Sequence, residues 1–209
     1  DDLIDHMRAV NYEGSYYMRT MQFENKRKVA DAVAAIVGCN AEEVAITRNT
    51  TESLDLVIGG IDWQAGDEAV MAEQDYGAML NHFELMERRY GIVNRRVSVP
   101  NHPHDDNELV ELYASVLTDK TRLLMISHMI NITGQVLPVR EIVDMAHERG
   151  VEVMVDGAHA YSHVPFQMSD LGWDYYGTSL HKWLSAPLGS GMLYVLKEKI
   201  DQIWPLFAE

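Results

Sequence analysis

Lys182 is the residue of this sequence whose surroundings most suggest chemistry, because the residues before it are almost all uncharged. The stretch Tyr175 to Trp183 (YYGTSLHKW) predicts a buried strand that ends in a short turn. Burying an ammonium group is costly unless the group is paired or its pKa falls, and a lysine with a lowered pKa is a nucleophile suited to Schiff-base chemistry. The alternative is a lysine whose aliphatic stem carries the charge out to water.

A carboxylate and an imidazole form a second candidate pair. Asp156 follows the apolar run Val151 to Val155, and His159 comes three residues later. A carboxylate at the end of such a strand would be partly desolvated and should have a cationic partner, for which a protonated ring nitrogen is suited. The alternative is an aspartate that caps the next turn.

A candidate anion site follows the run Val44 to Arg48. Asn49, Thr50 and Thr51 open a helix there, and a helix N-terminus with two hydroxyl groups can bind a phosphate. The alternative is a capping box from Asn49 to Glu52, which satisfies the helix start without any ligand.

An amide and an aromatic ring complete the candidates. Asn131 follows His128 after an apolar run and has an amide that can donate to a phenolate-like oxygen; the alternative is a turn-forming asparagine. Tyr76 follows another short run and lies on the apolar face of a predicted helix. An aromatic residue with helical spacing is more often part of a core than a stacking platform.

Alternating strands and helices must position these residues. The seven predicted strands are 44–48, 68–73, 93–99, 123–127, 151–155, 175–179 and 192–196. Helices are predicted at 22–37, from Asn49 onward, at 76–87, at 109–117 and at 139–146, and the first carries apolar residues at Val29, Val33, Ile36 and Val37 before Gly38. This order predicts a three-layer α/β/α fold with a mostly parallel sheet, in which ligands bind beyond the carboxyl ends of the strands.

Every candidate above follows a predicted strand, so the sequence places them at one edge of the sheet. An anion cradle, a carboxylate, an amide donor, an aromatic plate, a histidine and a lysine together suit one ligand, pyridoxal phosphate. This cofactor requires a lysine Schiff base, an acidic partner for its pyridine nitrogen and a phosphate site.

Four stretches carry a resemblance to a known family: TRNTTESLDL (47–56), SHMINITGQVLPV (127–139), VEVMVDGAHA (151–160) and TSLHKWLSAPLGSGMLYV (178–195). With their order and the 26 positions from Asp156 to Lys182, the sequence resembles the large domain of the class V aminotransferases, pyridoxal-phosphate enzymes of fold type I. The stretch HKWLSAPLGSG is more similar to the isopenicillin N epimerase-like branch than to the cysteine desulfurases.

The resemblance implies a role for each candidate. Lys182 would form the Schiff base, Asp156 would keep the pyridine nitrogen protonated, and His159 would bond the phenolic oxygen, so these three would be the catalytic residues. Cofactor binding would involve the same three residues together with Thr50, Thr51, Tyr76, Asn131, Ser179 and His181.

The resemblance also implies an enzyme that acts at the alpha carbon of an amino acid, by transamination or epimerisation, and a homodimer. Alternatives are a cysteine desulfurase or another C–S or C–C lyase of the family, or a binding module with reduced catalysis. We expect a helical segment at 1–40 and the cofactor-binding domain at 41–209. A smaller C-terminal domain, with the substrate-carboxylate arginine and any desulfurase cysteine, is expected beyond Glu209.

The composition of the chain limits its possible binding partners and its cellular compartment. The net charge of −15 argues against nucleic acid and anionic membranes as partners, and no apolar run is long enough to cross a bilayer. A single cysteine, Cys39, rules out an internal disulfide and fits the cytoplasm, although a first residue other than methionine leaves a removed leader open.

A metal site is the rival chemical interpretation. Asp156, His159 and His163 could be ligands, since the two histidines are four residues apart, and His102 with His104 makes a second pair. That interpretation leaves Lys182 and the two threonines unexplained, so we expect no metal.

Overall fold

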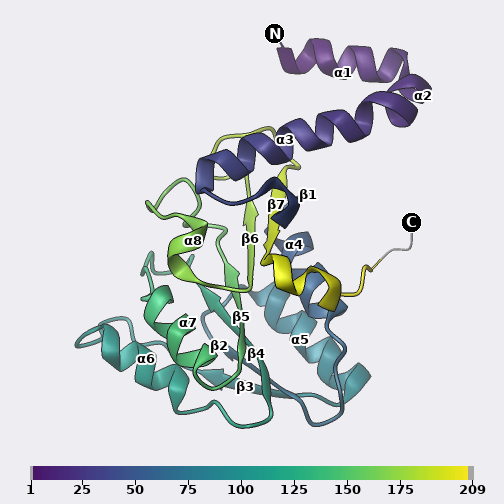
Figure 1. Ribbon diagram of the computed structural model, residues 1–209. Helices are drawn as coiled ribbons and strands as arrows, with labels where there is room; N and C mark the ends of the chain where they lie inside the picture. The colour runs from purple at the N-terminus through teal and green to yellow at the C-terminus, as the bar shows by residue number, and fades with distance from the viewer. Residues whose placement is uncertain (1, 207–209) are drawn as a thin grey trace.

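One sheet of seven strands organises the fold (Figure 1). The computed structural model describes residues 2–206. The strands lie in the order β1-β7-β6-β5-β4-β2-β3. Their bounds are Val44–Thr47 (β1), Glu68–Ala72 (β2), Val93–Val97 (β3), Thr121–Ser127 (β4), Glu152–Asp156 (β5), Tyr175–Ser179 (β6) and Gly191–Val195 (β7).

The sheet is mostly parallel, which confirms the predicted fold class. Strands β2 to β6 pair in parallel, while β7 is antiparallel to both β6 and β1. The carboxyl ends of β1, β4, β5 and β6 therefore meet at one edge, and β7 begins there. The register shows this edge directly, because Ser127 pairs with Asp156 while Gly191 pairs with both Thr47 and Ser179.

Helices cover both faces of the sheet, and the strand sequences explain why. Alternate residues of the buried strands feed two separate apolar cores, one under α4 (Thr50–Gly60) and α5 (Gly77–Tyr90), the other under α6 (Asp106–Ala114) and α7 (Val139–His147). In β5, Val153 and Val155 enter the α7 core while Met154 enters the α4 core. Both faces of the sheet are thus covered by apolar side chains and helices, as is usual for a parallel sheet.

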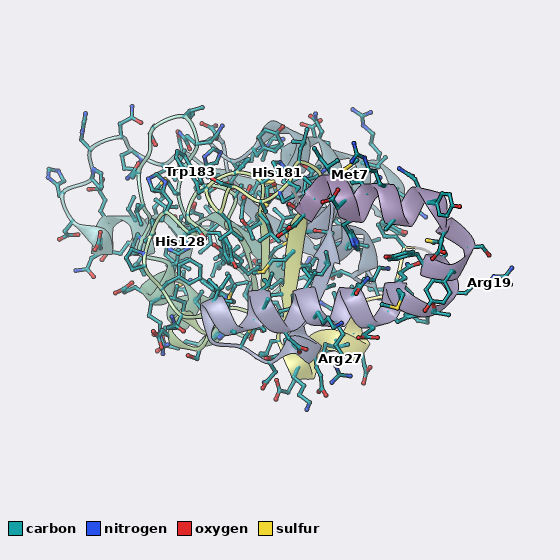
Figure 2. All side chains as sticks on the ribbon, turned by 90° about the horizontal axis from the view of Figure 1, so that it is seen from above. Met7, Arg19, Arg27, His128, His181 and Trp183 are labelled. Carbon is teal, nitrogen blue, oxygen red and sulfur yellow. The ribbon has the colours of Figure 1, made fainter. Side chains whose placement is uncertain are left out.

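The N-terminal residues form a helical arm that packs on the body of the fold through the end of its last helix and otherwise extends away from it (Figure 1). It contains α1 (Asp2–Tyr12), the short α2 (Gly14–Tyr16), a π-helical turn (Tyr17–Met21) and α3 (Gln22–Val37). Seen from above, Arg19 lies at the far end of this arm, whereas His181 and Trp183 lie over the body (Figure 2). No residue of α1 is buried.

The predicted apolar stripe of α3 is partly wrong. Val33 and Val37 are buried, but Val29 and Ile36 are exposed, and Ala30 and Ala34 take their places in the core. The helix ends as predicted at Gly38, whose left-handed φ of 69° suits glycine. Within residues 2–206, no helix is both long and apolar enough to cross a membrane.

Candidate active site

A single cavity at the carboxyl edge of the sheet brings together every candidate residue from the sequence. It is lined by Thr50, Thr51, Tyr76, Asn131, Asp156, His159, Ser179, His181 and Lys182. Asn49, from the predicted helix start, lines it too, together with three residues that were not candidates, namely Ser127, Met129 and Ala158. The candidates are thus neighbours in space, and the roles assigned to them remain predictions.

The expectation that Lys182 is buried is wrong. Strand β6 ends at Ser179, and Lys182 lies in the turn that follows, with an exposed side chain. It nevertheless lines the cavity, and its Nζ lies 3.2 Å from Nε2 of His159. Partial burial of the amine lowers its pKa, against which the charge of Asp156 acts. The physical argument for a nucleophilic lysine therefore holds in a weaker form than predicted.

His159 links the cavity to two neighbouring side chains. Its Nδ1 accepts a hydrogen bond from Nε1 of Trp183 at 3.4 Å, while its Nε2 faces Lys182. Burial, followed by the charges of Lys182 and His163, lowers the pKa of the imidazole. The neutral form of the ring is therefore favoured.

Asp156 ends β5 and is buried, as predicted. One carboxylate oxygen, Oδ1, accepts the backbone N–H of Ala158 at 2.9 Å. Burial raises the pKa of the carboxyl group, whereas that hydrogen bond and the charge of Lys182 lower it. The turn-capping alternative is therefore present as well, and it leaves the carboxylate on the cavity wall.

The start of α4 is bonded differently from either sequence interpretation. The backbone N–H of Thr50 donates to Oγ of Ser179 at 2.8 Å, and the two hydroxyl groups lie 2.7 Å apart. Asn49 caps Glu52 as predicted, but the Glu52 carboxylate bonds the N–H of Arg48, so a reciprocal capping box does not form. Two hydroxyl groups thus sit together at the positive end of a helix, a favourable place for an anion.

Gly191 allows the backbone to close around this end of the cavity. A Cβ on Gly191 would lie 2.7 Å from both N and Cα of Asn49, and 2.8 Å from O of Thr178. All of these neighbours are backbone atoms, which cannot move aside cheaply. Glycine at this position therefore lets β7 support the turn that presents Thr50 and Thr51.

Tyr76 and His181 flank the cavity from different elements. Tyr76 is the N-cap residue of α5 and is 50% exposed, so the alternative of an aromatic buried in the core is wrong. His181 is engaged at Nδ1, which lies 2.9 Å from the carbonyl oxygen of Ser190. Because Nδ1 donates there, Nε2 can donate to an anion only when the ring is doubly protonated.

The comparison with protein families gives a match over almost the whole chain. The model of the aminotransferase class-V family matches residues 5–208.

The chain belongs to the class-V aminotransferase family. Isopenicillin N epimerase of Streptomyces clavuligerus is 30% identical over 175 residues, which cover 84% of this chain and 44% of that protein. A cysteine desulfurase of Shigella sonnei is 34% identical over 189 residues, covering 89% of this chain and 45% of that protein. The chain thus spans less than half the length of these relatives.

Solved structures give the same result for the fold. The cystine C–S lyase C-DES, in complex with its reaction product cysteine persulfide, superposes with a TM-score of 0.89 at 28% identity. The match covers 97% of this chain and 54% of that one. A mutant of C-DES, with a TM-score of 0.86, holds glycine covalently linked to the PLP cofactor. The family recognised from the sequence and its cofactor, pyridoxal phosphate, are therefore confirmed.

The residues of this class-V chain fit that cofactor on chemical grounds. A buried carboxylate, paired hydroxyl groups at a helix start and an amine with a lowered pKa line one cavity. These are the three groups that pyridoxal phosphate needs, for its ring nitrogen, its phosphate and its aldehyde.

Asp75 is a further residue that the sequence did not single out. It is buried next to the cavity, and its Oδ1 accepts the hydroxyl of Ser127 at 2.6 Å while its Oδ2 accepts the N–H of Ala72 at 2.7 Å. Burial raises the pKa of Asp75 to about 7, and the charge of Asp156 adds to that effect. The sequence signal that could have selected Asp75 is its position just beyond the strand that ends at Ala72, because ligands bind beyond the carboxyl ends of such strands.

The alternative metal site is not formed. Among residues 2–206, no group of three or more His, Cys, Asp or Glu side chains is arranged to hold a metal ion. His163 instead stacks on Trp183, with ring centroids 4.1 Å apart, and its Nδ1 lies 3.1 Å from the carbonyl oxygen of His159.

Proposed function

We propose that this chain is the cofactor-binding domain of a pyridoxal-phosphate enzyme that acts at the alpha carbon of an amino acid. The observation that carries the proposal is the cavity in which Lys182, Asp156 and the Thr50–Ser179 hydroxyl pair lie together. Each belongs to a different segment, and each suits a different part of one cofactor.

When bound, pyridoxal phosphate supplies an aldehyde that condenses with amines and a ring that accepts electrons from the alpha carbon. Lys182 would hold the cofactor through its amine and would move the proton at the substrate's alpha carbon. Asp156 would keep a proton on the ring nitrogen, because a buried carboxylate favours a cationic partner. His159 and Asn131 donate to the phenolic oxygen.

The helix start of α4 and its neighbours hold the phosphate. Thr50, Thr51 and Ser179 offer hydroxyl groups, and His181 lines the same cavity. Tyr76, the N-cap residue of α5, also lines the cavity, and its side chain would stack on the pyridine ring of the cofactor.

The oligomeric state, the compartment and the domain division are part of the same proposal. Exposed apolar side chains on the arm, among them Met7, Phe23 and Val29, give it a surface that suits packing against a second subunit, and we propose a homodimer. We also propose a cytoplasmic enzyme and the division of the chain into a helical segment (1–40) and a cofactor-binding domain (41–209).

The direct test is to trap the cofactor on Lys182. Protein incubated with pyridoxal phosphate and then reduced with borohydride is expected to gain one phosphopyridoxyl group, found by mass spectrometry on the peptide that contains Lys182. We expect labelling at Lys182 because its amine lies at the cavity and has a lowered pKa, whereas Lys120 is an exposed surface lysine.

A Lys182→Arg variant should lose this labelling and a Lys120→Arg variant should keep it. Equal labelling of many lysines in the wild-type protein, with none preferred, would contradict the proposal.

A Ser179→Ala variant is expected to bind the cofactor about ten-fold more weakly. The change removes the hydroxyl that holds Thr50 and leaves the Thr50 N–H without its partner, a loss of roughly 1.4 kcal/mol. Equilibrium titration with pyridoxal phosphate measures the effect. Ser169→Ala, an exposed serine in the short helix α8 (Met168–Leu171), is the matched control and should bind as the wild type does.

A C–S lyase or desulfurase reaction is the second candidate, favoured by the similarity to C-DES. Cys39 does not suit the role of a sulfur nucleophile, because burial and the charge of Glu43 raise the pKa of its thiol to about 11. A panel of amino acids separates the candidates, since epimerisation inverts the alpha carbon while lysis releases sulfur. A binding module would bind the cofactor and change none of them.

A further inference from the structure

Both ring nitrogens of His159 are in contact with nitrogen atoms that ordinarily donate. Nε1 of Trp183 lies 3.4 Å from Nδ1 and donates to it, and Nζ of Lys182 lies 3.2 Å from Nε2. An indole N–H is a donor only, and an ammonium group is likewise a donor only. A neutral imidazole has one acceptor nitrogen, so it cannot accept from both neighbours.

Only one arrangement of protons satisfies both contacts. The indole cannot accept, so Nδ1 must be the acceptor, and the proton of the neutral ring is then on Nε2. That N–H points at Lys182, whose Nζ can receive it only as an uncharged amine with a free lone pair. A protonated Lys182 would instead require the other tautomer, with its Nδ1–H facing the indole N–H.

The indole is held in position by a further contact. The His163 ring lies at 31° to the Trp183 ring with centroids 4.1 Å apart, and Nδ1 of His163 lies 3.1 Å from the backbone oxygen of His159. The titratable groups around the His159 ring are Lys182 and His163, and Asp156 acts on it through Lys182. Asp156 is the one group among them that favours a charged lysine.

We propose that Trp183 is a positioning residue that fixes His159 with its proton on Nε2 and thereby keeps the Lys182 amine uncharged and ready to react. This inference rests on the proposed function of Lys182. With the cofactor bound, the same Nε2–H is the donor that His159 offers to the phenolic oxygen.

The tautomer can be measured directly. In protein labelled with 15N-histidine and without added cofactor, the His159 signals, assigned by their loss in His159→Gln, should report a protonated Nε2 and an unprotonated Nδ1 near pH 8. A Trp183→Phe variant keeps a ring for His163 to stack on but removes the indole N–H. Its His159 should then shift toward the tautomer protonated on Nδ1. A wild-type ring protonated on Nδ1 would overturn the proposal without reference to any variant.

The amine provides a second readout. The rate at which trinitrobenzenesulfonate modifies Lys182, followed by mass spectrometry of its peptide, should rise with pH as the ammonium group loses its proton. In Trp183→Phe the midpoint should move up by roughly half a pH unit to one pH unit, since His159 can then accept from the ammonium. Trp204→Phe, which changes a 70% exposed tryptophan, should leave the midpoint unchanged.

An unchanged midpoint and tautomer in Trp183→Phe would overturn the positioning role, even if borohydride still traps the cofactor on Lys182. Failure of that trapping, with the tautomer as expected, would instead count against the proposed function alone.

Discussion

An Asp156→Asn variant should bind pyridoxal phosphate yet exchange the alpha proton of amino acids about 10²- to 10³-fold more slowly. Asparagine has nearly the same shape, and its Oδ1 can still accept the N–H of Ala158. It cannot carry the negative charge that favours a protonated ring nitrogen. Loss of one preorganised electrostatic partner in a buried site typically has an effect of this size.

Two measurements check this result. Proton exchange in heavy water gives the rate, and the 15N signal of a ring-labelled cofactor reports the protonation of its nitrogen without any substrate. The nitrogen should be protonated in the wild type and unprotonated in the variant. Asp62→Asn removes one charge from an exposed site and serves as the control. A ring nitrogen that stays protonated in Asp156→Asn would contradict the role of this carboxylate.

An Asp75→Asn variant should be more stable than the wild type above pH 7, by up to about 4 kcal/mol in the free energy of unfolding. Burial raises the pKa of Asp75 from an ordinary value of 3.8 to about 7, so the folded state holds a proton that the unfolded state releases. The wild type therefore loses stability as the pH rises from about 4 to about 7. Asparagine does not titrate, and its amide can bond Ser127 while its oxygen accepts the N–H of Ala72.

Unfolding by denaturant at a series of pH values measures the effect. The difference between variant and wild type should be near zero below pH 4 and should grow until about pH 7. Asp119→Asn, at an exposed position, should show no such dependence. A variant that is destabilised equally at all pH values would mean that folding does not raise the pKa of Asp75.

The sequence by itself determined the architecture and most of the residues that line the cavity. Short apolar runs that alternate with helical stripes leave few options other than a parallel sheet covered on both faces. Since parallel strands point the same way, residues after their carboxyl ends must share one edge. That rule was sufficient to select Thr50, Asn131, Asp156 and Lys182, which line one cavity.

Only the tertiary structure decided how deep each group lies and what it bonds. The chain turns after Ser179, so Lys182 is exposed, although the residues before it are almost all uncharged. Thr50 finds its partner in Ser179, 129 positions away.

The burial of Asp75 and the hydrogen bond of Trp183 also depend on the tertiary structure. Asp75 precedes a helix, as many surface aspartates do, and its burial depends on how β4 brings Ser127 beside it. Trp183 follows the lysine in sequence, but its bond to His159 exists only because the turn after β6 folds over the end of β5. Local patterns indicate which face of an element is apolar, because that depends on the periodicity of its own residues, although Val29 and Ile36 of the stripe predicted for α3 are exposed. Burial, pKa and hydrogen-bond partners depend on atoms supplied by distant segments, and no local pattern encodes those.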